Sequence, residues 1–560
     1  MRQAGRNGVA PICPSASTWV EPPLGFGELQ IIALERWKGD KNDPRYKNLL
    51  GAIRAVAAGE AVRARLPSAR PWPNLSRRAT VIGGGTAVGL AALGAWELLK
   101  PAGAGATNSI AVMPFANLSG DQSQTYFSDG IAEELRSAIS RLQGLKVAGR
   151  ISSEAVRNED AATAARRLRV ATILTGSVRR APGLLRITSQ LIDGRSGLER
   201  WSASYDRPQG NVLAIQTDIA EKVVAALSIE LGHVAIQALG AGGTSNAEAH
   251  DLYLRAAKQV RNDDSEPSLK QANALLDTAI AIDPQFARPY AAKSHNLSYL
   301  ADVARSPQET AKGYDLAIGA ARRALALAPS LADGHAALAD ALYGQRKISA
   351  SIDQVQAGLN FAPADIELLQ AAVIGFVAAG QTARALNAAD RMVEIDPLNS
   401  LAHRRRYYAL FYDRQYDACI AEAQRTQRLA PTLTLPALFI AFSLIMTGRA
   451  KEAEPYVAAL PVDLTVRLAG EAIIAAKLGD RAGSDRSLKQ LTRLYGDAAS
   501  YQFAQAYAQR GEQNRAFSAL ERGFAVNDPG LNTLRVDPLF DPIRGAPRFA
   551  SMLKRVDVPA

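Results

Sequence analysis

The sequence holds little of the chemistry from which active sites and metal centres are usually built. Only two of its 560 residues are cysteine, Cys13 and Cys419, and only five are histidine. The cysteines form no C-x-x-C pair and no cysteine–histidine cluster, which excludes a disulfide framework and a zinc site of ordinary spacing. The triple glycine at 83–85 lacks the G-K-[ST] of a phosphate loop. We therefore expect two free thiols, no catalytic residue, no metal and no cofactor.

Positive charge is concentrated at the start of the chain. The formal net charge is +11, of which the first 100 residues carry +7 and the other 460 carry +4. A nucleic-acid reader presents a basic face within a folded domain. Here the basic residues instead surround an apolar stretch, as they do around membrane helices. The charge distribution therefore predicts no nucleic-acid partner.

The apolar stretch 79–99 has the length of a membrane span. Its residues up to Trp96 contain no charge, and about 17–25 predominantly apolar residues cross a bilayer. Arg77 and Arg78 precede it, so the positive-inside rule predicts a single-pass protein of the cytoplasmic (inner) membrane. The amino terminus would be cytoplasmic, and the chain after about residue 100 periplasmic. A buried Gly/Ala-rich helix, a flexible linker and a displaced export signal are the alternatives.

Two columns of residues recur along the second half of the chain at a spacing of 34. Prolines end alanine-rich helical runs, and a small residue stands twelve positions before each of them. Such a period indicates an array of two-helix units, in which a small side chain permits close packing and proline ends the unit. The proline column contains Pro329, Pro363, Pro397 and Pro431 at this spacing, with Pro284 eleven residues farther back than the period requires. The small column contains Ala317, Ser351, Ala385, Cys419 and Ala453 at this spacing, with Ala272 twelve residues before Pro284.

The period resembles that of the tetratricopeptide repeat family over residues 246–530. The resemblance implies a mainly α solenoid that binds protein or peptide partners. Gly380, Gly448 and Gly511 mark turns within units, and residues 531–560 are predicted to cap the last apolar face. The units are predicted at 253–286, 298–331, 332–365, 366–399, 400–433 and 434–467, followed by two less regular ones, with eleven extra residues at 287–297.

A basic and aromatic group lies on the first helix of one predicted unit. We expect that helix to line the concave face, where the group could contact an acidic peptide; a solvated helix face is the alternative. His335 shares the repeat position of the first member, which favours packing between helices for both histidines. The group consists of His403, Arg404, Arg405, Arg406 and Tyr407.

The pattern of residues 108–232 predicts a small α/β domain. The periodicity predicts strands at 110–115, 145–148, 172–179, 184–193 and 198–205, and helices at 131–142, 161–168 and 215–231. The segments SIAVMPFANLSGD (109–121), YFSDGIAEELRSAISRL (126–142), LTGSVRR (174–180), RITSQLIDGRSG (186–197) and WSASYDR (201–207) resemble the TolB amino-terminal-like domain. That resemblance implies a non-catalytic domain that serves association in the cell envelope and needs no cofactor.

Three acidic residues of this domain could suggest an active site. Asp129 stands where a helix N-cap is expected, and Glu133 and Glu134 would then lie in the first turn, where the helix dipole favours acids. Capping explains all three, so we predict no catalytic role for them.

The first 78 residues divide into two parts. Trp37, Gly39, Asp40, Asp43 and Pro44 resemble the end of a bacterial TIR domain, so residues 1–60 are interpreted as a partial TIR-like remnant or a disordered tail. The family's nucleotide site lies upstream of this match, so its NAD-cleaving activity is not carried over. Residues 61–78 form a basic, proline-rich linker.

Together these features predict a membrane-anchored scaffold or regulatory signalling protein that binds protein partners through its repeats. The alternative is the regulatory part of a larger signalling protein. Its front domain would be a TIR-linked NAD hydrolase, a nucleotide cyclase or a DNA-binding transcriptional regulator.

Overall fold

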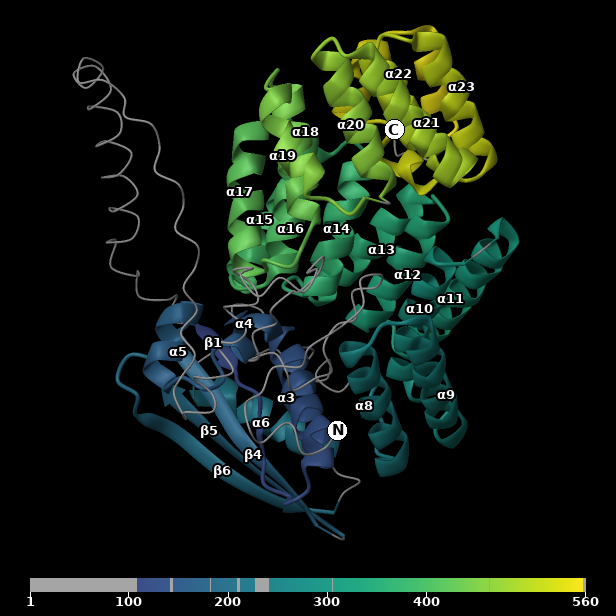
Figure 1. Cartoon of the computed structure of the whole chain (residues 1–560). Coiled ribbons are helices and arrows are strands. Elements are labelled where there is room, and N and C mark those ends of the chain that lie inside the picture. Colours follow the sequence, from purple (N-terminus) through teal and green to yellow (C-terminus); the bar gives the residue numbers. More distant parts are fainter. Residues whose placement is uncertain are drawn as a thin grey trace, which may run out of the picture. The chain divides into compact units, whose positions relative to one another are not determined.

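The computed structural model describes residues 108–141, 145–181, 183–208, 212–226, 241–304, 306–462 and 464–556. The predicted TIR-like segment 1–60, the linker 61–78 and the membrane span 79–99 lie outside these ranges. Over the described ranges, an α/β domain is followed by an array of helices (Figure 1).

The α/β domain is built on one mixed sheet. Its strand order is β3-β1-β4-β5-β6, and the short β2 also pairs with β4. β1 is parallel to β3 and β4, whereas β4, β5 and β6 form an antiparallel meander. The strands are β1 (Ser109–Val112), β2 (Ala116–Asn117), β3 (Lys146–Val147), β4 (Thr172–Ala181), β5 (Leu184–Asp193) and β6 (Glu199–Arg207).

Alternation along β1 distributes side chains to two cores. Ile110 and Val112 join the cluster that includes residues of α3 (Thr125–Ser140) and α6 (Val212–Ala226). Ala111 joins the opposite cluster, with residues of α5 (Ala161–Leu168). A strand that is apolar on both faces is expected where helices cover both sides of a sheet. The short α4 (Arg150–Ala155) also contacts β1.

The capping role predicted for Asp129 is wrong, because helix α3 begins four residues earlier, at Thr125. Phe127 precedes Ile131 and Leu135 at steps of four, so it extends the buried face of the helix by one turn. Asp129 therefore lies inside the helix, and Glu134 lies in its third turn. Burial raises the pKa of Asp129.

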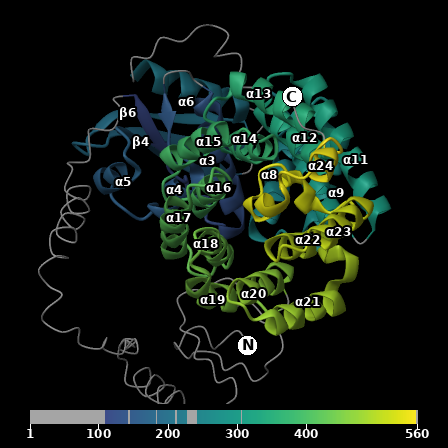
Figure 2. The same cartoon turned by 90° about the horizontal axis from the view of Figure 1, so that it is seen from above.

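The repeat array consists of antiparallel helix pairs, each with a first and a second helix. Figure 2 shows successive pairs side by side, from α8 in teal to α23 in yellow-green. The pairs are α8 (Ala247–Asn262) with α9 (Glu266–Ile282), α10 (Ala287–Asp302) with α11 (Pro307–Leu327), α12 (Ala332–Gly344) with α13 (Ile348–Phe361), α14 (Ile366–Ala378) with α15 (Thr382–Ile395), α16 (Ser400–Tyr412) with α17 (Tyr416–Leu429), α18 (Leu435–Met446) with α19 (Ala450–Ala458), α20 (Thr465–Lys477) with α21 (Arg481–Tyr495), and α22 (Ser500–Gln509) with α23 (Gln513–Ala525).

First helices contact the first helices of neighbouring pairs, from α10 through α22. They form the inner layer of the array, and the second helices pack behind them. The small column lies on second helices: Ala272, Ala317, Ser351, Ala385, Cys419 and Ala453 are each 0–1 % exposed. Pro284, Pro329, Pro363, Pro397 and Pro431 all begin the turn that follows a second helix.

The second pair departs from the 34-residue frame. Residues 287–297 begin helix α10, and helix α11 has 21 residues. The eleven extra residues therefore lengthen a helix pair. The unit that the sequence frame begins at 298 begins in the structure at Ala287.

The turns within the six described pairs from α12 to α23 share a left-handed backbone residue. Gly380, Gly448 and Gly511 all have φ between 75° and 78°, and Gly479 has φ of 84°. Two arginines hold the same turn position, Arg346 with φ of 58° and Arg414 with φ of 63°. A side chain in this conformation costs about 1–2 kcal/mol relative to glycine.

The C-terminal segment covers the last pair and also returns to earlier repeats. It comprises η5 (Pro529–Thr533), η6 (Pro538–Ile543) and α24 (Pro547–Leu553). η6 packs on α22, whereas η5 contacts α14. Asp541 accepts a 2.8 Å hydrogen bond from Arg414, 127 residues away in the chain. The segment therefore bounds one side of the inner layer.

Candidate binding groove

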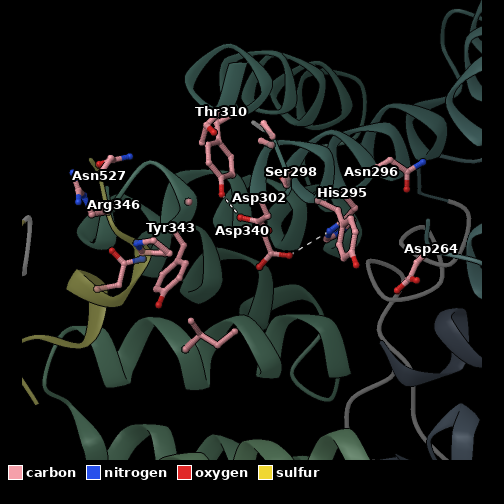
Figure 3. A pocket seen from close by; sticks show the side chains of 18 of the residues that line it. Asp264, His295, Asn296, Ser298, Asp302, Thr310, Asp340, Tyr343, Arg346 and Asn527 are labelled. Carbon is pink, nitrogen blue, oxygen red and sulfur yellow. Dashed lines mark hydrogen bonds and ion pairs between the residues drawn. The ribbon is translucent and has the colours of Figure 1, made fainter. Parts of the chain in front are cut away.

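A groove of about 1170 Å³ follows the inner layer of the array. First helices α10, α12, α14 and α16 supply one side, and the C-terminal stretch 526–532 supplies part of the other. Figure 3 shows polar side chains from these elements pointing into the space. Because each repeat presents its first helix here, one surface is built from residues of four repeats.

One part of the groove is acidic. Asp302 accepts a hydrogen bond from Tyr314, and Asp340 lies 3.3 Å from His295 Nδ1 (Figure 3). Glu367 also lines the groove. Burial would lower the pKa of His295, but its bond to Asp340 outweighs this and raises the pKa to about 9. The imidazole is therefore a cation near neutral pH.

The carboxylates of this acidic wall, which we define as Asp302, Asp340 and Glu367, are not fully neutralised. Burial raises the pKa of Asp302, and Asp340 adds to the rise. Burial also raises the pKa of Glu367, and the charge of His295 only partly opposes that effect. A cation placed among these groups would be favoured.

The arginine end of the groove is defined by Arg346, Arg404 and Arg405. None of these guanidinium groups forms an ion pair or hydrogen bond with another residue that the structure describes. Burial lowers the pKa of Arg346, and burial together with Arg404 lowers that of Arg405 to about 10. Asp528 and Asp340 act on Arg346 and Arg405 through space and partly oppose that lowering. No carboxylate of the described residues pairs with these guanidinium groups directly, as carboxylates usually do with arginine.

Several buried polar atoms in the groove have no hydrogen-bond partner within the described part of the chain. Asn532 and Ser298 are only 4 % and 7 % exposed, yet Asn532 Oδ1 and Ser298 Oγ are unpaired. Arg346 Nη1, Arg405 Nε and Gln370 Oε1 are unpaired as well. A buried polar atom without a partner costs about 1–3 kcal/mol. A polar ligand in the groove would recover part of that cost.

The α/β domain is joined to the array through one buried carboxylate. Glu134 of α3 binds Arg288 of α10 and lies 2.8 Å from His250 Nε2 of α8. Gln216 of α6 donates a further 2.7 Å hydrogen bond. Burial opposes ionisation of Glu134, but His250 and Arg288 outweigh it and lower its pKa to about 2. Glu134 therefore connects the two parts of the chain as an anion.

A second contact joins the same parts near the turn between α15 and α16. Asp396 accepts a 2.7 Å bond from the Ser152 amide, and Ser152 Oγ accepts one from the Leu398 amide. Gly149 donates to the Ile395 carbonyl at 2.9 Å. The α/β domain thus contacts both the start and the middle of the array.

A smaller polar hollow of about 570 Å³ lies where the α/β domain meets α8. Asp251 lines it and accepts hydrogen bonds from Tyr126 at 2.6 Å and from Arg180 at 2.7 Å. Because the Asp251 carboxylate already has two partners, we interpret the hollow as part of the junction between the α/β domain and the array.

The basic and aromatic group divides between the groove and the packed interior. Arg404 and Arg405 line the groove. Arg406 instead pairs with Asp390 and Glu422. His403 and Tyr407 are 0 % exposed, so their side chains are not available to a partner. As the repeat position implies, His403 and His335 pack alike: each lies 2.9 Å from the carbonyl of the proline six residues before it.

Sequence reasoning missed Arg346, the acidic wall and the Glu134 junction. Arg346 could have been found, because it stands 34 residues before Gly380 in a column otherwise rich in glycine. The other groups could not, because only the packing of distant elements brings them together.

Within the described ranges, no group of three or more metal-ligating side chains comes together. No helix of those ranges is long and apolar enough to cross a membrane. The predicted span 79–99 lies outside them.

These features define a mainly helical solenoid of tetratricopeptide type that follows a small α/β domain. No family model matches the chain. It is 34% identical over 243 residues to a protein of Rhizobium meliloti (strain 1021) described as "Putative adenylate cyclase 3". The alignment covers 43% of this chain and 41% of that relative.

Solved repeat proteins are similar to parts of the chain. Pseudomonas aeruginosa PilF is 19% identical, with 38% of this chain and 93% of that one covered and a TM-score of 0.31. A tetratricopeptide repeat protein of Parabacteroides merdae is 13% identical, with 44% and 94% covered and a TM-score of 0.34. YrrB, described as a TPR protein with an unusual peptide-binding site, is 14% identical, with 38% and 97% covered and a TM-score of 0.27. The assignment of the fold rests on the helix pairs themselves.

Proposed function

We propose that this protein is a scaffold that binds a protein or peptide partner in the groove of its repeat array. The observation that carries the proposal is the set of unpaired polar atoms along a groove built by four repeats. Interior polar groups are normally satisfied, so five unpaired side chains in one groove support a surface that a partner completes; they are Ser298, Arg346, Gln370, Arg405 and Asn532. Repeat solenoids provide extended surfaces of this kind.

Photo-crosslinking tests this proposal. A photoreactive amino acid replaces Tyr299, which lines the groove and is 43% exposed, or Leu429 at the end of second helix α17, which is 38% exposed. We expect a discrete adduct from position 299 and none of the same mass from position 429. Equal adducts from both positions, or none from 299, would contradict binding in the groove.

We further propose that residues 79–99 anchor the chain in the cytoplasmic membrane and that the α/β domain assists association in the envelope. Support comes from the apolar composition of 79–99 and its two preceding arginines. Reporter fusions at residue 105 test the topology. A reporter that is active only in the cytoplasm would rule out the proposed orientation.

A second candidate function is the regulatory part of a nucleotide-cyclase-type signalling protein. The likeness to the Rhizobium meliloti relative favours it. The purified chain would be assayed for cyclic nucleotide formation, alone and after addition of the captured partner. Cyclase activity in the chain itself would replace the scaffold role with a catalytic one.

A further inference from the structure

Basic and acidic side chains occupy different parts of the groove. Figure 3 shows Arg346 and Asn527 at one end, with Asp302, Asp340 and His295 farther along and Asp264 at the opposite end. The arginine end and the acidic wall line the same groove. No ion pair between them occurs among the described residues. His295 occupies only Asp340 directly, and Asp528 acts on Arg346 only through space, so both sets can also take charges that come from outside.

Arg346 holds its place in the groove against its backbone preference. Its φ of 58° lies in the left-handed region, where the turns of four other pairs use glycine. A strained residue persists where the surrounding structure or its role requires the side chain. Arg414 shares the strain, but its guanidinium binds Asp541 of the C-terminal segment. Arg346 forms no direct ion pair with a described residue, although the charge of Asp528 acts on it, and its Nη1 atom is buried and unpaired.

Asn532 extends the arginine end with a second kind of group. The residue is only 4% exposed and its amide contacts Tyr343, yet its Oδ1 atom has no hydrogen-bond partner among the described residues. An amide acceptor beside guanidinium donors suits a peptide, which carries both carboxylate oxygens and backbone N–H groups. An inorganic anion alone would leave this acceptor unsatisfied.

We propose that the groove binds an extended peptide with a fixed polarity, its carboxylate at Arg346, Arg405 and Asn532 and a lysine or arginine side chain at the acidic wall. The proposal rests on the scaffold function above and specifies its ligand. The carboxylate belongs either to an acidic side chain or to the end of a peptide chain. Bidentate pairing of guanidinium with carboxylate gives such a site both affinity and direction.

Binding of short fluorescent peptides to the full-length protein in detergent tests the proposal. One peptide carries a Lys-Lys pair near its amino end and a Glu-Glu pair near its carboxyl end. An acid-only peptide and a base-only peptide replace one pair by glutamine, and a neutral peptide replaces both. We expect the peptide with both pairs to bind most tightly and the neutral peptide not to bind measurably.

Two variants separate the two ends of the groove. Arg346→Gly should weaken the doubly charged and acid-only peptides about tenfold, the usual effect of losing a charged hydrogen bond. It should leave the base-only peptide unchanged. Glu367→Gln should weaken the doubly charged and base-only peptides about tenfold and leave the acid-only peptide unchanged. Arg414→Gly is the matched control, because it makes the same change at the same turn position outside the groove and should alter no affinity.

Glycine is favoured in this backbone conformation, so Arg346→Gly remains folded and a loss of binding reports the side chain. Unchanged affinity of the acid-only peptide for Arg346→Gly would overturn the proposal. If no peptide binds while the adduct at position 299 persists, the scaffold function stands and the charge polarity is wrong. A copy of the doubly charged peptide with an amidated C-terminus identifies which carboxylate binds. Loss of binding points to the terminal carboxylate, and retained binding points to an acidic side chain.

Discussion

Arginine stands twice in a column where glycine is the better residue. Both Arg346 and Arg414 carry a left-handed backbone, and each points its guanidinium toward the side on which the C-terminal segment lies. The 34-residue period makes this column visible in the sequence. It does not show that one arginine is paired and the other is not, because Asp541 lies 127 residues from Arg414.

Replacing Arg346 by glycine should stabilise the protein. Removing the left-handed strain is expected to raise the free energy of unfolding by about 1 kcal/mol. Arg414→Gly gains the same relief but loses a partly exposed ion pair, so its net change should be small. Urea denaturation of the three proteins measures the effect. A destabilised Arg346→Gly variant would show that the guanidinium supports the fold itself.

Glu134 makes the stability of the junction depend on pH. Its pKa is about 2 in the folded chain against an ordinary value of 4.5. A carboxyl with a lowered pKa stabilises the fold above the unfolded value and loses that effect as pH falls through the folded value. The free-energy difference between the wild type and Glu134→Gln should therefore shrink between about pH 4.5 and 2. A difference that stays constant over this range would contradict an ionised Glu134 at the junction.

Removing the carboxylate should also loosen the attachment of the α/β domain. Glu134→Ala leaves Arg288 and His250 buried without their partner, a change that typically costs about 3–5 kcal/mol. Limited proteolysis should release the α/β domain sooner from this variant. Glu248→Gln, an exposed change in the first turn of α8, is the control and should leave the cleavage rate unaltered.

At the scale of elements, the sequence predicts the repeats well because their information is local and periodic. The small column and the prolines lie where the 34-residue frame places them, on second helices and in the turns after them. The predicted helix at 131–142 begins later than α3, which begins at Thr125, because the apolar pattern did not include Phe127. The return of the C-terminal segment to α14 and to the turn after α16 carries no periodic signal.

A bulky residue at the small column should disrupt one helix pair. Ala385 is fully buried in α15, so Ala385→Trp is expected to destabilise the protein by about 1–3 kcal/mol or more. Ala383 is exposed on the same helix, and Ala383→Trp is the control. Thermal unfolding compares the two. Equal stability of both variants would show that the assigned contact between the helices is wrong.

At the scale of the whole molecule, the described chain combines a groove with a domain that is fixed to the array at two places. Glu134 attaches the α/β domain at α8 and α10, and Ser152 attaches it beside the turn before α16. These contacts depend on residues 116 or more positions apart, so no local pattern could predict them. They hold the α/β domain against the array.

Hydrogen–deuterium exchange of the full-length protein, with and without the partner captured at position 299, tests the central claim most directly. Binding in the groove predicts slower exchange in the first helices α10, α12, α14 and α16 and in the stretch 526–532, with second helices α13 and α15 unchanged. Protection confined to the second helices or to edge strand β6 would contradict it.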